Sequence, residues 1–148
     1  MDKYIQTVRQ KNDAFFAETA RRPTSFVETF GCQQNEADSE KLRGMADAMG
    51  YAQAADAAHA DLIIVNTCAI REHAELRALS TIGQYKHLKA KNPNLRIGVC
   101  GCMVAQEHRI EELKRSYPYV DFTFEPAALD LFPEILCEAL EYGKRSFS

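Results

Sequence analysis

The 148-residue chain lacks several features that would assign it to a particular class of protein. No apolar run approaches the roughly 18 residues that a membrane-spanning helix needs, so we expect no membrane segment. The first ten residues are polar and contain no apolar stretch typical of a secretory signal. We therefore expect a soluble, cytoplasmic protein.

An excess of positive charge is also lacking. The chain has 18 Lys and Arg against 21 Asp and Glu, for a formal net charge of −3. Proteins that mainly grip phosphate backbones usually carry a basic face. The composition therefore gives no support for this chain being a principal RNA-binding surface.

The cysteines do not form the even set that is typical of a disulfide framework. There are five of them: Cys32, Cys68, Cys100, Cys102 and Cys137. Because the cytosol keeps thiols reduced, an odd number favours metal ligation, a reactive thiol or inert buried cysteine over disulfides.

The sequence does contain a repeated alternation of strand and helix patterns. Residues 61–66 form a nearly continuous β-branched run, typical of a parallel strand covered on both faces. The alternation predicts a single doubly wound α/β domain, flavodoxin- or Rossmann-like, with a mostly parallel sheet and an extra N-terminal helix. We expect strands near 25–29, 61–66, 95–100 and 120–124, a short edge strand within 51–58, and helices near 2–22, 35–49, 71–91, 104–116 and 127–142.

The expected organisation has three parts. Residues 1–23 are predicted to be a helical extension that Pro23 ends, and residues 24–143 the main domain. Residues 144–148 are predicted to begin a linker. Pro126 stands where the first position of a helix favours proline.

Three cysteines occupy equivalent positions in successive units. Cys32, Cys68 and Cys102 each follow a predicted strand and precede a predicted helix. Because the carboxyl ends of parallel strands share one edge of the sheet, we expect these thiols to meet there. Helix N-termini favour an anionic group, such as an iron–sulfur cluster held by thiolates. Gly31 and Gly101 would allow the tight turns and close backbone approach of such a site.

Other interpretations of these cysteines stay open. Free cysteine often only fills core space, and a zinc site with three cysteines uses the same ligands. We interpret Cys100, at the end of a strand, and Cys137, on an apolar helix face, as core residues.

Neighbouring polar residues are candidates for supporting roles. Asn66 and Thr67 are expected to fix the turn that presents Cys68. Asn35 is interpreted either as a helix N-cap or as a substrate contact.

Three motifs that contain these cysteines resemble those of the radical-SAM methylthiotransferases. They are TFGCQQN at 29–35 followed by DSE at 38–40, NTCAIRE at 66–72, and GVCGCM at 98–103. The resemblance covers about residues 25–142 and is greatest to the branch that acts on isopentenylated adenosine in tRNA. Gln34 departs from the usual methionine, and Glu125 and Pro126 stand where Gly-Thr is expected.

The resemblance implies a set of cofactors and partners. Cys32, Cys68 and Cys102 would hold a [4Fe–4S] cluster, with Gly31, Asn35, Asn66, Thr67 and Gly101 around it. A second [4Fe–4S] cluster and S-adenosylmethionine would belong to a radical-SAM domain with a CxxxCxxC motif, and a TRAM domain would help to grip the tRNA. This chain has no CxxxCxxC motif. We therefore expect a truncated part of a larger enzyme that is inactive alone.

Alternative functions are a methylthiotransferase acting on threonylcarbamoyl adenosine or on a ribosomal protein, and a stand-alone flavodoxin-like module. A flavodoxin-like module normally has a Ser/Thr/Gly-rich phosphate loop after the first strand, and residues 30–35 offer little of that.

Overall fold

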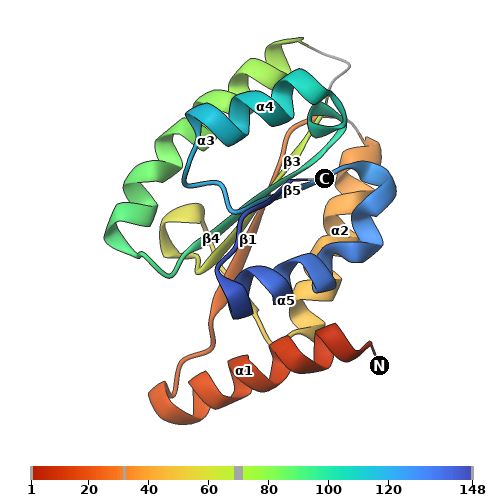
Figure 1. Cartoon of the computed structure of the whole chain (residues 1–148). Helices are drawn as coiled ribbons and strands as arrows, with labels where there is room; N and C mark the ends of the chain where they lie inside the picture. Colours follow the sequence, from red (N-terminus) through yellow and green to blue (C-terminus); the bar gives the residue numbers. More distant parts are fainter. Residues whose placement is uncertain (1, 32, 69–71, 148) are drawn as a thin grey trace.

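A computed structural model describes residues 2–31, 33–68 and 72–147, which form five α-helices and six strands (Figure 1). The elements follow in the order α1 (Lys3–Thr19), β1 (Thr24–Thr29), α2 (Gln33–Ala48), β2 (Ala52–Gln53), the 3₁₀ turn η1 (Ala57–His59), β3 (Leu62–Thr67), α3 (Glu72–Lys91), β4 (Arg96–Gly101), the 3₁₀ turn η2 (Cys102–Ala105), α4 (Glu107–Ser116), β5 (Phe122–Phe124), the 3₁₀ turn η3 (Pro126–Leu131), α5 (Phe132–Tyr142) and β6 (Ser146–Phe147).

The six strands form one parallel sheet in the order β2-β1-β3-β4-β5-β6. Every residue of the central strand β3 is buried, as its β-branched run predicts. The strand order reverses between β1 and β3, which is the switch point at which ligands collect in doubly wound sheets. The doubly wound α/β prediction is confirmed, and the sheet is parallel throughout its described strands.

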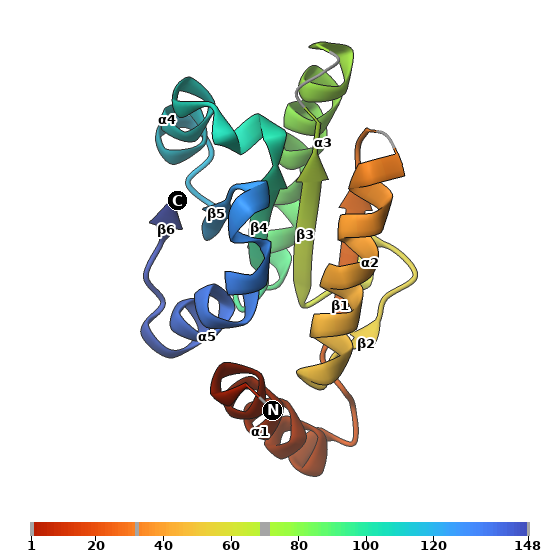
Figure 2. The same cartoon turned by 90° about the vertical axis from the view of Figure 1, so that its right-hand side faces the viewer.

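Helices cover both faces of the sheet. Figures 1 and 2 show α3 and α4 on one face and α2 and α5 on the other, with α1 across the end of the domain near α5. Alternate residues of β3 separate the two cores, since Ile64 faces the α2–α5 layer and Ile63 and Val65 face the α3–α4 layer.

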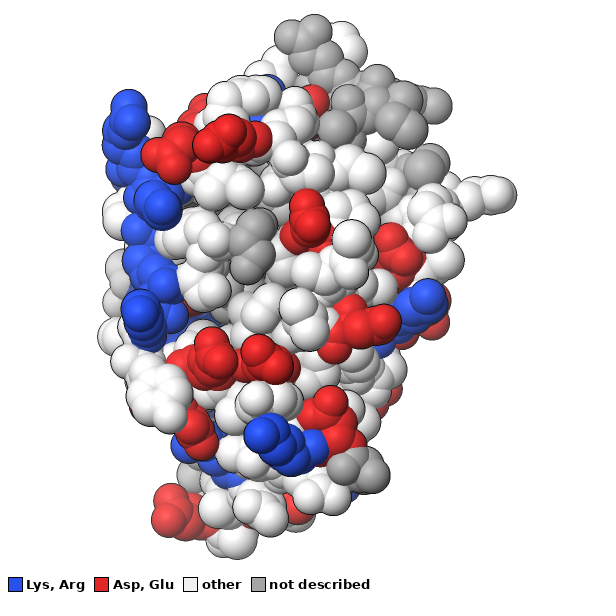
Figure 3. Space-filling model, turned by 45° about the vertical axis from the view of Figure 1, so that its right-hand side comes forward, with Lys and Arg blue, Asp and Glu red and all other residues white. Residues whose placement is uncertain are grey.

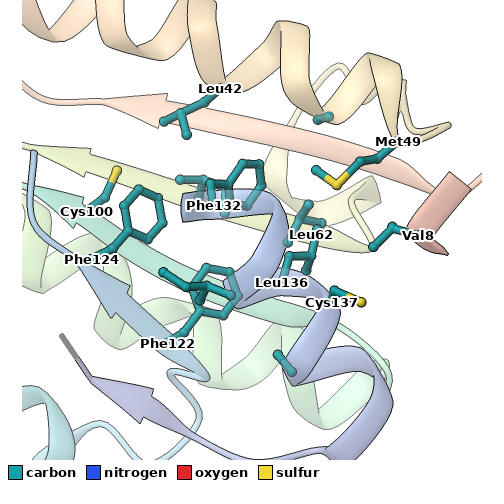
Figure 4. Close-up of a cluster of buried hydrophobic side chains, with 14 of the residues drawn as sticks. Val8, Leu42, Met49, Leu62, Cys100, Phe122, Phe124, Phe132, Leu136 and Cys137 are labelled. Atoms are coloured by element: carbon teal, nitrogen blue, oxygen red, sulfur yellow. The ribbon is translucent and has the colours of Figure 1, made fainter. Parts of the chain in front are cut away.

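An aromatic group lies at the centre of the α2–α5 layer (Figure 4). The rings of Phe122, Phe124 and Phe132 are 5.8–6.4 Å apart between centroids, and all three are fully buried. Burial of each such ring contributes about 1.5–3 kcal/mol. Cys100 and Cys137 belong to the same cluster, which confirms their interpretation as core residues.

The first helix is shorter than predicted. Asp2 caps α1 by accepting hydrogen bonds from the backbone N–H groups of Tyr4 and Ile5. The helix ends at Thr19, before Pro23, because Ala20 adopts a left-handed conformation with φ 59°. Asn12 joins α1 to the domain by donating to the carbonyl oxygen of Met49 at 2.9 Å.

The C-terminal third differs most from the predicted pattern. Two predicted helices each begin as a 3₁₀ turn, η2 before α4 and η3 before α5. Ser146 and Phe147 were expected in a linker but pair with β5 as strand β6. Arg145 holds this strand in place, because it donates to the carbonyl oxygens of Val120 and Tyr117 and lies 4.6 Å from the ring of Phe147.

Ion pairs between distant segments hold the amino end of the sheet. Asp61 accepts from Arg21 and from the backbone N–H of Thr24, both at 2.9 Å. Asp121 pairs with Lys89 and also accepts from the backbone N–H of Ile97 at 2.8 Å. Lys89 lies in the last turn of α3, so this ion pair connects the end of that helix to the start of β5.

The charged surface is mixed. On the face in Figure 3, Lys and Arg gather along one edge, whereas Asp and Glu are spread across it. None of the helices in the described part of the chain is both long and apolar enough to cross a membrane.

Candidate functional site

A cavity of about 390 Å³ lies at the carboxyl ends of β1, β3 and β4, next to the start of η3. The residues that line it come from all three cysteine motifs and from the segment after β5: Gln34, Asn35, Asp38, Cys68, Gly101, Cys102, Pro126 and Ala127. The carboxyl end of β3 points to the upper end of the domain in Figure 2. Three cysteines were predicted to lie together at this edge of the sheet. The structure brings two of them, Cys68 and Cys102, to one cavity.

The two cysteines differ in exposure. Cys68 directly follows the last residue of β3 and is only 3% exposed, whereas Cys102 is the first residue of η2 and is exposed. Cys32, the third predicted ligand, lies outside the described residues. A helix was expected to follow Cys102 directly. Instead, Cys102 begins the 3₁₀ turn η2, and the α-helix α4 starts at Glu107.

Glycines bring the backbones of the three motifs close together. Gly31 and Gly101 have φ angles of 138° and 96°, a region that favours glycine. A Cβ atom on Gly31 would lie 2.7 Å from the Cβ of Cys68 and would also collide with Asn35. A Cβ atom on Gly101 would collide with the backbone of Thr67. Tight turns are thus observed at both glycines, whereas the close approach of their backbone to a cluster stays a prediction.

A buried network of uncharged side chains joins α2 to β3 beside the cavity. Asn35 donates to the carbonyl oxygen of Thr67 at 2.8 Å, and Asn66 donates to the carbonyl oxygen of Asn35 at 2.8 Å. Asn66 also donates to the hydroxyl of Ser39 at 3.0 Å, and the Ser39 and Thr29 hydroxyls are 2.7 Å apart. The N-cap interpretation of Asn35 is wrong, because Asn35 is the third residue of α2.

The expected role of Asn66 and Thr67 in fixing the Cys68 turn is consistent with these bonds. Thr67 donates from its hydroxyl to the carbonyl oxygen of Cys100 at 2.6 Å and thereby joins the ends of β3 and β4. Because both residues are buried, each hydrogen bond constrains the segments on which Cys68 and Cys102 lie.

Cys100 and Cys102 are two positions apart but have opposite environments. Burial, together with the negative charge of Asp38, raises the pKa of the Cys100 thiol well above its ordinary range. Metal ligands must be thiolates, so this environment disfavours Cys100 as a ligand. Gly101 turns the chain between them and leaves Cys102 at the cavity.

Sequence reasoning missed a second network, between α3 and α4. The carboxylate of Glu75 in α3 is 7% exposed and accepts from Arg109 at 2.9 Å and from Gln106 at 3.1 Å. Glu75 shares the helix face of the buried residues Ala78, Leu79 and Ile82. The sequence signal for this network was a carboxylate on the apolar face of a predicted helix, because a buried charge needs a partner.

Two positions differ from the motifs of the resembled family, Gln34 and the Glu125–Pro126 pair. Gln34 lies on the cavity wall and donates to Asp38 at 3.3 Å. Glu125 is exposed and makes no side-chain capping bond, and it is absent from the described lining of the cavity. Pro126 occupies the predicted first helical position, here of η3, and lines the cavity beside Ala127.

These residues fit a metal group held by thiolates. The cavity offers two cysteines, and the start of α2 nearby carries the partial positive charge of a helix N-terminus. Within residues 2–31, 33–68 and 72–147, no three His, Cys, Asp or Glu side chains are grouped as a metal site would require. A site with three cysteines would therefore need Cys32.

Comparison with known proteins identifies similar sequences. The model of "Uncharacterized protein family UPF0004" matches residues 24–125. A protein of Clostridioides difficile (strain 630), named tRNA-2-methylthio-N(6)-dimethylallyladenosine synthase, is 48% identical over 97% of this chain and 30% of its own length. Proteins of the same name from Caldicellulosiruptor saccharolyticus and Clostridium tetani are 43% and 50% identical, over 96% and 84% of this chain and 30% and 27% of their own lengths. The chain thus spans about 30% of the length of these relatives.

Proposed function

The chain belongs to the UPF0004 family, and from this premise we propose that it is the cluster-binding part of a tRNA methylthiotransferase. The single observation that carries the proposal is the meeting of Cys68 and Cys102 on one cavity at the switch point of the sheet. The names of these relatives favour dimethylallyl-modified adenosine over threonylcarbamoyl adenosine or a protein as the substrate.

We propose that Cys32, Cys68 and Cys102 together hold a [4Fe–4S] cluster. Thiolates are the usual protein ligands of such clusters. Gly31 and Gly101 would admit the close backbone approach, and Asn35, Asn66 and Thr67 would keep the motif backbones in register. When bound, the cluster would supply an iron without a protein ligand, to which the sulfur or methylthio group for the substrate can attach.

The other parts of the reaction would belong to the longer protein. We propose that a radical-SAM domain holds a second [4Fe–4S] cluster and S-adenosylmethionine, and that this domain and a TRAM domain complete the tRNA site. The five cysteines of this chain contain no CxxxCxxC motif, which supports the proposal that the chain is inactive alone. The tRNA substrate makes the cytoplasm the expected location.

Anaerobic reconstitution with iron and sulfide tests the cluster proposal. We expect the chain to bind about four iron and four sulfide ions and to gain the broad visible absorption of an iron–sulfur cluster. Cys32→Ala, Cys68→Ala and Cys102→Ala should each abolish stable binding, because each removes one of three ligands.

Cys137→Ala is the matched control, since this thiol is buried in the core and should not affect loading. Full iron retention in Cys68→Ala would contradict the ligand assignment. Uptake of zinc without iron would favour a zinc site with three cysteines.

A further inference from the structure

One buried carboxylate connects two segments that follow cysteines of the candidate site in the chain. Glu75 lies in the first turn of α3, the helix that follows the Cys68 motif. Gln106 ends the η2 turn that Cys102 begins, and Arg109 lies in the first turn of α4. Both residues donate to the same oxygen of Glu75, so a single side chain joins the segment after Cys68 to the segment after Cys102.

The surroundings make this connection rigid. Gln106 also donates to the carbonyl oxygen of Met103, a fully buried residue of η2, at 3.3 Å. Arg109 makes a second bond, to Glu112, at 2.9 Å, which holds its guanidinium in place. Charge-assisted hydrogen bonds of this kind are roughly twice as strong as neutral ones, and burial shields them from water.

Among the described residues, the other hydrogen bonds beside the cavity join different elements. The bonds of Asn35 and Asn66 join α2 to β3, and the hydroxyl of Thr67 joins β3 to β4. Glu75, Gln106 and Arg109 add a polar connection between η2 and α3 to the hydrophobic cluster that Met103 and Val104 of η2 share with Ala78 and Leu79 of α3.

We infer that Glu75 is a positioning residue that restrains the placement of Cys102 relative to Cys68 beyond what the pairing of β3 with β4 provides. This inference rests on the proposed function, because only a shared ligand makes the relative placement of the two thiols matter. Glu75 itself does not line the cavity, so it would act through Gln106, Arg109 and the η2 turn.

A trivalent arsenical that bridges two thiols measures this placement without iron or sulfide. The assay uses the chain with Cys32→Ala, so that the reacting pair is Cys68 and Cys102, which line the cavity, while Cys100 and Cys137 lie in the hydrophobic core. Glu75→Ala should weaken arsenical binding about tenfold or more, which corresponds to about 1.4 kcal/mol. Glu75→Gln should recover part of the loss, because its amide oxygen can still accept both hydrogen bonds.

Asp121→Ala is the matched control at the opposite end of the sheet. Like Glu75, Asp121 accepts from one cationic side chain and from one uncharged N–H donor. Both alanine variants should lower the midpoint of urea unfolding, but only Glu75→Ala should weaken the arsenical complex. Circular dichroism in the absence of urea checks that both variants are folded under the conditions of the binding assay.

Each outcome has a defined meaning. Equal arsenical binding by the Cys32→Ala chain with and without Glu75→Ala would overturn the inference. Equal weakening of binding by Asp121→Ala in the same chain would also overturn it. Failure of the Cys32→Ala chain itself to bind the arsenical would overturn the inference too, since Cys68 and Cys102 would then not be held together. If the Cys32→Ala variants show the expected arsenical pattern but the unsubstituted chain takes up no iron on reconstitution, the proposed function is contradicted and the positioning role stays intact.

Discussion

The hydrogen bonds beside Cys68 differ in chemistry from the ion pairs at the amino end of the parallel sheet. At the amino end, Asp61 and Asp121 pair with Arg21 and Lys89 from distant segments. At the carboxyl end, the hydrogen bonds closest to Cys68 come from uncharged Asn and Thr side chains and from backbone carbonyls. Asp61 therefore contributes stability that depends on pH, because its pKa is lowered, whereas the bonds beside Cys68 fix geometry around a cavity without adding a charge.

Gly101→Ala should have the largest effect, because it alters the carboxyl end where the backbones are closest. The new Cβ atom would collide with the backbone of Thr67 and would force a left-handed φ on alanine. Left-handed strain and overpacking each cost about 1–3 kcal/mol, so we expect a loss of about 3 kcal/mol in the free energy of unfolding. Urea denaturation measures this loss, and an unchanged midpoint would show that the close approach is not required.

Asp61→Asn tests the amino end and should have an intermediate effect. Burial alone would raise the pKa of Asp61, but hydrogen bonds from Arg21 and Thr24 more than offset it, so the pKa lies below its ordinary 3.8. The variant weakens a charge-assisted bond and should cost about 1–3 kcal/mol at neutral pH.

The pH dependence of this contribution has a defined sign. Because the pKa is lower in the folded than in the unfolded chain, the unfolded chain binds more protons between the two values. The stabilisation is thus complete above about pH 4 and is lost as the pH falls through the folded pKa. Unfolding curves between pH 7 and roughly pH 3 should converge for Asp61→Asn and the parent chain, and parallel curves would exclude this role.

Gly44→Ala should have the smallest effect, and one of opposite sign. Gly44 lies inside α2, and a Cβ atom there would meet no atom within 4 Å. Alanine in a helix interior is favoured over glycine by about 0.5–1 kcal/mol, so the variant should be slightly more stable. Thermal unfolding of Gly44→Ala beside Gly101→Ala separates the cost of a close approach from the general cost of replacing glycine.

The sequence was sufficient to predict the central part of the fold. Apolar runs located β1, β3 and β4, and the repetition of these runs was enough to place Cys68 and Cys102 at one edge of the sheet. Gly31 and Gly101 were also predictable, because glycine beside a candidate ligand indicates a turn that other residues disfavour.

The connecting contacts could not be predicted in the same way. Glu75 and Arg109 are 34 positions apart, and no local pattern pairs them. Strand β6 has two residues and depends on Arg145 bonding to Val120 and Tyr117, so it has no apolar run of its own. The N-cap assignment of Asn35 failed because α2 begins two residues earlier, at Gln33, and the bond of Asn35 to Thr67 on β3 joins positions 32 residues apart.

The parallel arrangement of the sheet also has a kinetic consequence. Each pair of neighbouring strands is separated in the chain by a helical segment, so no ladder can form as a local hairpin. Proteins dominated by such non-local pairings fold slowly compared with helical bundles, because long loops must close first. The residues before Cys68 and Cys102 are paired between β3 and β4, so the arrangement of these two thiols at the cavity depends on one such long-range pairing.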